Sequence, residues 1–186
     1  MQLYCRSSHY LGLILILMFG FFTKVAHADI EVGKPAPEFE LYDQQQRKHH
    51  LKDYVGKWLV LYFYPKDDTP GCTIEACTFR DDYHRIRALN AEILGVSLDS
   101  IESHAQFATG QRLPFPLLSD PDGAVAAAYG SLLALGPVKL ARRHTIIIDQ
   151  RGHIARIYRR VDPKRHSTQI IVDLQELQSK LRQHNN

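Results

Sequence analysis

Short apolar runs alternate along the chain with longer stretches in which apolar residues recur every three or four positions. The runs indicate strands, and an almost wholly apolar run such as residues 58–64 is typical of a strand buried on both faces of a sheet. The strands predicted in this way are residues 58–64, 91–98, 115–118, 145–149 and 153–160. Phe39 and Leu41 alternate with polar neighbours and predict a further short edge strand, with which residues 49–51 can pair.

Helices are predicted at residues 73–89, 100–110, 123–129 and 167–182. The last of them is amphipathic, with apolar residues such as Ile170, Leu174 and Leu181 on one side and Ser167 as a candidate N-cap. Strands and helices alternate, and a hairpin turn at residues 150–152 joins the last two strands. This order predicts an α/β fold with a mixed central sheet flanked by helices.

The first 28 residues predict a segment that is separate from this fold. Residues 11–22 are apolar apart from two glycines, and Ala26-His27-Ala28 is an A-x-A cleavage pattern. This layout is typical of a secretory signal peptide, and the run is short for a membrane span of about 20 residues. We therefore expect a signal peptide at residues 1–28, one domain at residues 29–186 and a periplasmic or otherwise exported protein. An uncleaved N-terminal membrane anchor is the alternative.

The 158 residues from Asp29 onward are enough for one domain with its own hydrophobic core. Cleavage would remove Arg6 and Lys24, which leaves 21 of the 23 basic residues against 20 acidic ones, a formal net charge of +1. A balance so close to neutral gives no reason to expect a nucleic acid or a membrane surface as a partner of the mature form. Two cysteines remain, Cys72 and Cys77, and such a pair is compatible with an oxidising compartment.

Residues 64–77 connect a buried strand to a predicted helix through a turn rich in Pro, Asp and Gly. Pro70 suits the first position of a helix, where its missing N–H matters least. Cys72 therefore lies on or just inside a helix N-terminus, where unpaired backbone N–H groups and the helix dipole favour an anion. The thiolate, which is the reactive form of a cysteine, is stabilised at such a position.

Cys77 follows Cys72 by five residues, which on an ideal helix separates the two Cα atoms by roughly 8–9 Å. A disulfide needs a separation of about 4.4–6.8 Å. The two cysteines therefore cannot bridge while the helix is intact. If they do bridge, the first turn or two of the helix must unwind, so we expect an element with a folded and a locally unfolded state.

Pro65, Thr69 and Cys72 form the pattern P-x-x-x-T-x-x-C, and residues 71–77 read G-C-T-I-E-A-C. This resembles the active-site motif of the peroxiredoxins, in the branch called bacterioferritin comigratory protein or Q type. The resemblance extends over about residues 32–181. Further matching stretches are residues 115–123 and 143–149. The resemblance implies a thioredoxin-like fold and a thiol-dependent peroxidase that reduces hydrogen peroxide and organic hydroperoxides in antioxidant defence.

The resemblance also implies a role for each residue of the candidate site. Cys72 attacks the peroxide and becomes a sulfenic acid, and Cys77 resolves it as an intramolecular disulfide. Thr69 offers its hydroxyl to the thiolate and to a peroxide oxygen, and Pro65 shields the sulfur from water. Arg143 holds the thiolate negative and hydrogen-bonds the leaving oxygen with a planar fork that lysine lacks. No cofactor or metal is implied.

The partners that follow are a peroxide substrate and an outside dithiol that reduces the disulfide. Because we expect export, the donor would be a membrane-fed thioredoxin-like protein and not cytosolic thioredoxin. The cysteine pair is contained in one chain, so we expect a monomer. The alternative is that Cys77 stays free and that a second chain or a small thiol resolves the sulfenic acid.

The chain departs from the family pattern in two places. Ile146 stands where the family usually has Phe, and residues 131–140, near the expected mouth of the pocket, match poorly. Spacing alone does not decide which of Arg142 and Arg143 faces the thiolate, but the match of R-x-T to the family favours Arg143. Glu75 is interpreted as a charge near the helix N-terminus that favours the dipole, and not as a proton carrier.

Two other functions are compatible with an exported thioredoxin-like fold. A thiol–disulfide oxidoreductase would use C-x-x-C and would show a proline where this chain has Arg143 and His144. A copper-carrying protein would use C-x-x-x-C with a distant histidine, for which His144 or His153 could serve. The cysteine spacing fits neither class. The adjacent His49 and His50 lack a third ligand at a suitable spacing, so we expect them on a solvated face.

Overall fold

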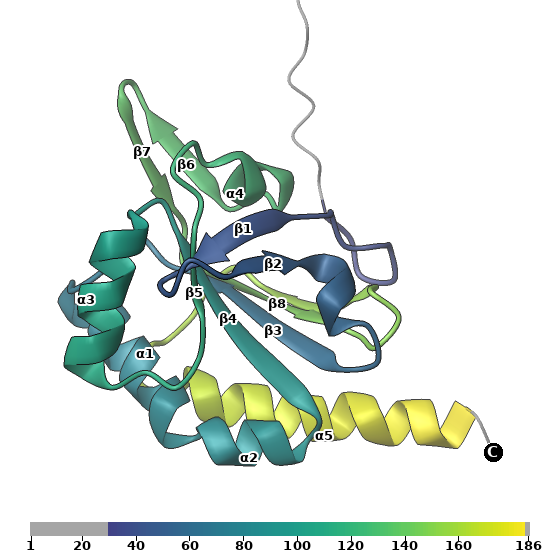
Figure 1. Cartoon of the computed structure of the whole chain (residues 1–186). Coiled ribbons are helices and arrows are strands. Elements are labelled where there is room, and N and C mark those ends of the chain that lie inside the picture. The colour runs from purple at the N-terminus through teal and green to yellow at the C-terminus, as the bar shows by residue number, and fades with distance from the viewer. Residues whose placement is uncertain (1–29, 185–186) are drawn as a thin grey trace, which may run out of the picture.

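In the computed structural model, which describes residues 30–184, nine strands and five helices follow the order that Figure 1 displays. The strands are β1 (Glu40–Asp43), β2 (Lys48–His50), β3 (Trp58–Phe63), β4 (Ala91–Ser97), β5 (Leu117–Ser119), β6 (Leu132–Leu135), β7 (Val138–Ala141), β8 (His144–Ile148) and β9 (Ile154–Tyr158). The helices are α1 (Pro70–Asp81), α2 (Tyr83–Ala88), α3 (Ile101–Gln111), α4 (Ala124–Ala128) and α5 (His166–His184), with a 3₁₀ turn η1 (Leu51–Tyr54) after β2. The predicted signal peptide at residues 1–28 lies outside the described residues. Within residues 30–184, no helix is both long and apolar enough to cross a membrane.

Seven of the strands form one mixed sheet in the order β2-β1-β5-β4-β3-β8-β9. β3, β4 and β5 are parallel, whereas β8 runs antiparallel to β3 and β9 antiparallel to β8. The predicted mixed α/β sheet is therefore confirmed. The expectation that the strand after Phe39 is an edge strand is wrong, because β1 pairs with β5 as well as with β2. Alternation of apolar and polar residues indicates only that the two faces of a strand differ. It does not indicate whether one or two other strands pair with that strand.

The two faces of the sheet bury two separate hydrophobic cores. Val60 and Tyr62 of β3 belong to the core beneath α1, α2, α3 and α5, whereas Leu59 and Leu61 belong to the core beneath α4 and the N-terminal segment. All six residues of β3 are buried, as their continuous apolar run predicts. Figure 1 shows α2 and α5 on one side of the sheet, with α4 and the β6–β7 hairpin on the other.

The helix predicted at residues 73–89 is two helices. Asp82 has φ −93° and ψ 3°, so α1 ends before it and α2 begins after it. Its carboxylate accepts a hydrogen bond from the hydroxyl of Ser167 at 2.7 Å. The prediction that Ser167 caps the last helix is therefore wrong: it lies inside α5, and its hydroxyl is used in this contact with a segment 85 residues away.

Residues 132–141 form a β-hairpin, β6–β7, that the sequence pattern does not predict. The register pairs Leu133 with Leu140 and Leu135 with Val138, and the hairpin forms a two-stranded sheet of its own. In Figure 1 it projects from the body of the molecule with its turn pointing away from the central sheet. This is the segment that matches the family pattern poorly.

His49 is not on a freely solvated face. Its Nε2 lies 2.9 Å from a carboxylate oxygen of Asp43, and its Nδ1 lies 2.6 Å from the hydroxyl of Tyr54. The side chain therefore connects the β1–β2 hairpin to the turn η1, and this gives His49 a structural role.

Candidate active site

Cys72 lies where β3 ends and α1 begins. Thr69 precedes the helix in an extended conformation, Pro70 is its first residue and Cys72 its third, as the sequence predicts. The side chain of Cys72 belongs to the core beneath the helices and is only 2% exposed. The sulfur therefore lies in the first turn of α1, where backbone N–H groups have no partner within the helix.

Arg143, which lies between β7 and β8, is the arginine that reaches this sulfur. Its Nη2 donates a hydrogen bond to Sγ of Cys72 at 3.2 Å. Arg142 is exposed, and its backbone N–H donates to the carbonyl of Ser131 at the base of the hairpin. The structure thus brings Cys72 and Arg143 together across 71 residues of sequence. A guanidinium at this distance favours the anionic sulfur through a charge-assisted hydrogen bond.

Glu75 is the second partner of Arg143. Its carboxylate is wholly buried and accepts a hydrogen bond from Nη1 of Arg143. Burial raises the pKa of the Glu75 carboxyl to about 7, although the neighbouring Arg143 acts to lower it. The interpretation of Glu75 as a charge near the helix N-terminus missed this contact. Glu75 follows Cys72 by three residues, which puts both side chains on one face of α1. This spacing is the signal in the sequence that indicates a shared site.

Asp67 holds the loop between β3 and α1 in place, whereas the sequence alone indicates only that it belongs to a turn. Its buried carboxylate accepts hydrogen bonds from Tyr64, Ser103 and His104 at 2.7, 2.7 and 2.9 Å. Its backbone N–H donates to the carboxylate of Asp99 at 2.9 Å. Burial acts to raise the pKa of Asp67, but the hydrogen bonds, that of His104 first, lower it overall, so the carboxylate is the favoured form. These contacts join the loop to α3 and to the end of β4.

Thr69 and Pro65 lie in this same loop and are half-buried. The hydroxyl of Thr69 donates to the backbone carbonyl of Lys66 at 3.0 Å. In this state its proton is directed away from Cys72, while its oxygen remains an acceptor. The structure therefore places both residues beside the start of α1 without forming the hydrogen bond between Thr69 and the sulfur that the resemblance implies.

Cys77 lies on the same helix as Cys72, and both cysteines are free thiols. The Cys77 side chain is half-buried and points toward α3, where its Sγ lies 3.6 Å from the side-chain oxygen of Gln111. The backbone carbonyl of Gln111 also accepts a hydrogen bond from Arg80 of α1 at 2.8 Å. With α1 intact between the two cysteines, they lie too far apart for a disulfide.

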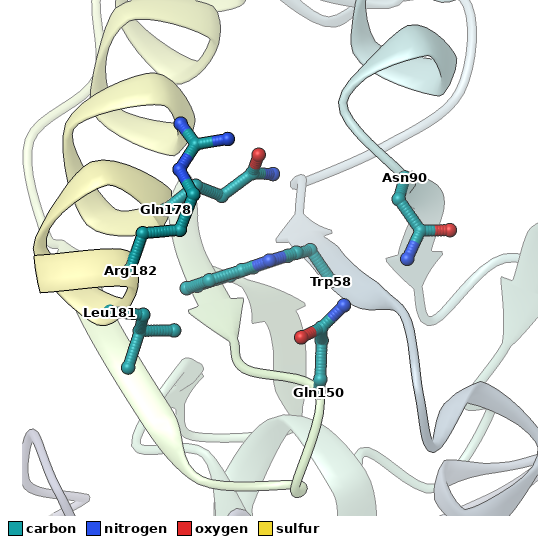
Figure 2. Close-up of a pocket in the computed structure, with 6 residues that line it drawn as sticks. All are labelled: Trp58, Asn90, Gln150, Gln178, Leu181 and Arg182. Carbon is teal, nitrogen blue, oxygen red and sulfur yellow. The ribbon is translucent and has the colours of Figure 1, made fainter. Parts of the chain in front are cut away.

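Two cavities lie at the other end of β3. The first has a volume of about 220 Å³ and is lined by Trp58, Gln150, Leu181 and their neighbours (Figure 2). The second, of about 620 Å³, shares Trp58 and Leu181 with it. Trp58 begins β3 and the site follows its end, so the length of the strand, roughly 16 Å, separates the cavities from Cys72. Neither cavity includes Cys72. In residues 30–184, no group of three His, Cys, Asp or Glu side chains is arranged to hold a metal ion.

Most of the chain is similar to known proteins. The family model described as AhpC/TSA family matches residues 32–157. The chain is 40% identical over 155 residues to Peroxiredoxin Bcp of Bacillus subtilis, which spans 81% of this chain and 99% of that protein. It is also 40% identical over 151 residues to the chloroplastic Peroxiredoxin Q of Sedum lineare, which spans 81% of each chain.

Two solved structures are similar over most of their length. The Mycobacterium tuberculosis peroxidoxin BcpB has a TM-score of 0.75 and 32% identity, and covers 79% of this chain and 97% of its own. The bacterioferritin comigratory protein of Xanthomonas campestris, which was studied for its alkyl peroxide reduction activity, has a TM-score of 0.73 and 30% identity, and covers 78% of this chain and 98% of its own. The predicted thioredoxin-like fold is confirmed by this likeness.

Proposed function

Since the chain belongs to the AhpC/TSA family, as a peroxiredoxin of the Bcp and Q type and hence a thiol-dependent peroxidase, we propose that Cys72 is the residue that attacks the peroxide. Its buried sulfur, in the first turn of α1 and in contact with Arg143, supports this assignment. The substrates of a peroxiredoxin are peroxides, and its reductant is a thioredoxin-like dithiol. Hydrogen peroxide and organic hydroperoxides are the substrates that we propose here.

In the first step the Cys72 thiolate attacks one oxygen of the peroxide. An S–O bond forms and the O–O bond breaks, so the sulfur is oxidised by two electrons to a sulfenic acid. The other oxygen leaves as hydroxide or alkoxide, takes a proton and departs as water or an alcohol. Arg143 stabilises the negative charge on the sulfur and on the leaving oxygen, because its fork of N–H donors is held by Glu75. Thr69 donates to the peroxide after its hydroxyl turns from Lys66, and Pro65 limits the access of water.

In the second step the thiol of Cys77 condenses with the Cys72 sulfenic acid. An S–S bond forms, and one molecule of water leaves. The separation of the two cysteines on α1 means that the N-terminal part of this helix unwinds before the bond can form. A thioredoxin-like dithiol then reduces the disulfide by exchange and returns both thiols. Because both sulfurs come from one chain, the cycle needs no second copy, and we propose that the protein is a monomer.

The contact between Arg143 and the Cys72 sulfur is the observation that carries the proposal. Stopped-flow measurement of peroxide consumption by the wild type and by Cys72→Ser tests it. We expect the wild type to react with peroxide far faster than free cysteine in solution, and the variant to show no such reaction. A wild-type rate no higher than that of free cysteine would remove Cys72 from its proposed role.

We propose further that residues 1–28 are a signal peptide and that the mature domain begins at Asp29 outside the cytoplasm. The apolar run at residues 11–22 followed by Ala26-His27-Ala28 supports this. The electron donor would then be a thioredoxin-like protein of the same compartment. Sequencing the N-terminus of the protein recovered from a fractionated bacterial host tests the proposal. An intact N-terminus in the membrane fraction would support the uncleaved anchor instead.

A further inference from the structure

The β6–β7 hairpin has one face that is wholly apolar. Successive residues of a strand point to opposite faces, and cross-strand partners share a face. The pairs Leu133–Leu140 and Leu135–Val138 therefore lie on the same face. Leu135 and Val138 are 64% and 54% exposed, and the other two are half-buried.

At the base of the hairpin, the opposite face contacts the rest of the molecule, whereas Ala134 and Lys139 further along that face are exposed. Ala141 is buried in the core beneath α4, and Leu132 packs against that core beside Gly123. The Leu133–Leu140 and Leu135–Val138 pairs consequently face outward. A two-stranded ribbon gains little stability by itself, so an outward face made only of Leu and Val is best explained by contact with something else.

Two cations lie at the base of this hairpin, and a third lies beside its tip on the face opposite to the Leu–Val pairs. Lys139 is on β7, Arg142 follows the hairpin, and Nη1 of Arg159 donates to the carbonyl of Gly130 just before it at 3.5 Å. All three side chains are exposed and, within residues 30–184, none forms an ion pair. The two arginines act on the buried His144: burial, then Arg159 and Arg142, lowers the pKa of His144 to about 4.

An apolar tip with one exposed cation beside it and two at its base matches the chemistry of an anionic phospholipid surface. Apolar side chains enter the boundary between head groups and acyl chains, while Lys and Arg side chains extend to the phosphates. We propose that the β6–β7 hairpin is a docking surface for anionic phospholipid membranes, and that it presents lipid hydroperoxides to Cys72. This rests on the proposed function, since it names a substrate class for the same site.

The position of the hairpin relative to the site supports the substrate class. Arg142 closes the base of the hairpin, and the next residue, Arg143, contacts the Cys72 sulfur. The hairpin that would dock therefore leads directly into the residue that holds its guanidinium against the sulfur. The net charge of +1 gives no reason to expect membrane association, but it does not report that three exposed cations lie on or beside one hairpin.

A second copy of the chain is the competing occupant. A symmetric dimer through this face would bring Arg142 and Arg159 of one copy toward the same two cations of the other. Contacts of this kind are repulsive unless acidic side chains intervene. An anionic surface has the opposite charge, so the charge at the base of the hairpin favours lipid over self-association.

Flotation of vesicles decides between these occupants. The protein used is residues 29–186, which contain both hydrophobic cores and every strand of the described fold. We expect it to float with vesicles that mix phosphatidylcholine and anionic phosphatidylglycerol, to do so more weakly as salt is raised, and to stay unbound with phosphatidylcholine alone. Replacing both Leu135→Ser and Val138→Ser should weaken binding about tenfold or more. Replacing Lys139→Gln together with Arg142→Gln, which removes two positive charges, should weaken vesicle binding several-fold.

Val172→Ser is the matched control, because Val172 is an equally exposed valine that lies on α5. Equal flotation of the Leu135/Val138 double variant and this control would overturn the proposal. So would a wild-type dimer in sedimentation that dissociates in the double variant, since it would identify a second copy as the occupant.

Turnover supplies the second readout. The rate with a phospholipid hydroperoxide in anionic vesicles, divided by the rate with hydrogen peroxide, should fall about tenfold in the double variant. An unchanged ratio would overturn the presentation of lipid peroxides. Failure of the wild type to consume hydrogen peroxide would count against the proposed function alone, because flotation does not depend on catalysis.

Discussion

Arg143 forms an ion pair with Glu75 while the same guanidinium donates a hydrogen bond to the sulfur of Cys72 at 3.2 Å. Glu75 is wholly buried and Arg143 is half-buried, so little water competes with these contacts. Two nitrogens of one planar group are thus fixed on two acceptors of the same helix, α1. The position of the cation over the sulfur therefore depends on a carboxylate one helical turn further along α1.

The first prediction concerns the fork geometry of Arg143. Arg143→Lys keeps a positive charge but cannot reach Glu75 and Cys72 together, so we expect Cys72 oxidation to slow by about ten- to a hundredfold. Arg143→Met, which removes the charge, should slow it by about a hundredfold or more. Stopped-flow peroxide consumption measures both. Arg182→Lys, at the far end of α5, is the control and should react like the wild type. A lysine variant with the wild-type rate would show that charge alone is sufficient.

The second prediction concerns the space beside Arg143. A Cβ atom added at Gly71 would lie 3.2 Å from Nη2 of Arg143, the nitrogen that contacts Cys72. Gly71→Ala should therefore shift the guanidinium and slow Cys72 oxidation by about three- to tenfold. Alanine is the better helix former, so the melting temperature should not fall.

Gly110→Ala is the matched control for this change. Gly110 also lies in a helix, α3, and a Cβ there would meet nothing within 4 Å. We expect this variant to oxidise at the wild-type rate. If Gly71→Ala also oxidised at the wild-type rate, a shift of the Arg143 guanidinium would have no effect on the reaction of Cys72.

The third prediction concerns stability and pH. Burial raises the pKa of Glu75 in the folded state to about 7, above its ordinary value of 4.5, so the folded state binds a proton more tightly than the unfolded one. The free energy of unfolding should therefore rise as pH falls from about 7 to 4.5, and this contribution is lost as pH rises through 7. As pH falls over this range, the free energy of unfolding of the wild type should rise by at most about 3 kcal/mol relative to that of Glu75→Gln.

Denaturant unfolding of both proteins at a series of pH values measures this difference. Glu31→Gln, a change at an exposed glutamate, should leave the pH profile of the wild type intact. Parallel profiles for the wild type and Glu75→Gln would mean that Glu75 stays ionised throughout the range.

The fourth prediction separates the two cysteines. Cys77→Ser should leave the rate of Cys72 oxidation nearly unchanged, because Cys77 faces Gln111 and not the sulfur of Cys72. Turnover with a thioredoxin-like donor should be blocked, since the sulfenic acid has no partner in the chain. Trapping of the sulfenic acid with a dimedone probe should rise accordingly. Full turnover by this variant would assign resolution to a second chain or to a small thiol.

The sequence predicts the core of the fold well because its strongest signals are local. The apolar run of β3 and the turn with Pro70 before α1 are each readable from neighbouring residues. Asp82, where α1 and α2 separate, is hydrogen-bonded to Ser167, which is distant in sequence. The hairpin β6–β7 is not predicted because its two runs of four residues are too short for periodicity to distinguish a strand from a buried helical segment.

The same distinction applies to the candidate site. Cys72 and Cys77 follow from a local motif, and the family resemblance favours Arg143 over Arg142, which the contact with the sulfur supports. Asp67 could not be recognised in this way. Its partners His104 and Ser103 belong to α3, and only the tertiary fold brings them to the loop.

Asp82 also limits how much of the molecule has to melt in each catalytic cycle. It ends α1 and is anchored by Ser167 of α5 and by Arg85 of α2, at 2.7 Å in both cases. Loss of the N-terminal turns of α1 therefore need not spread into α2, whose Ile86 remains in the core. In the oxidised enzyme, backbone amide hydrogens would then exchange faster only at the start of α1. The rest of the fold would stay native when the enzyme meets its reductant.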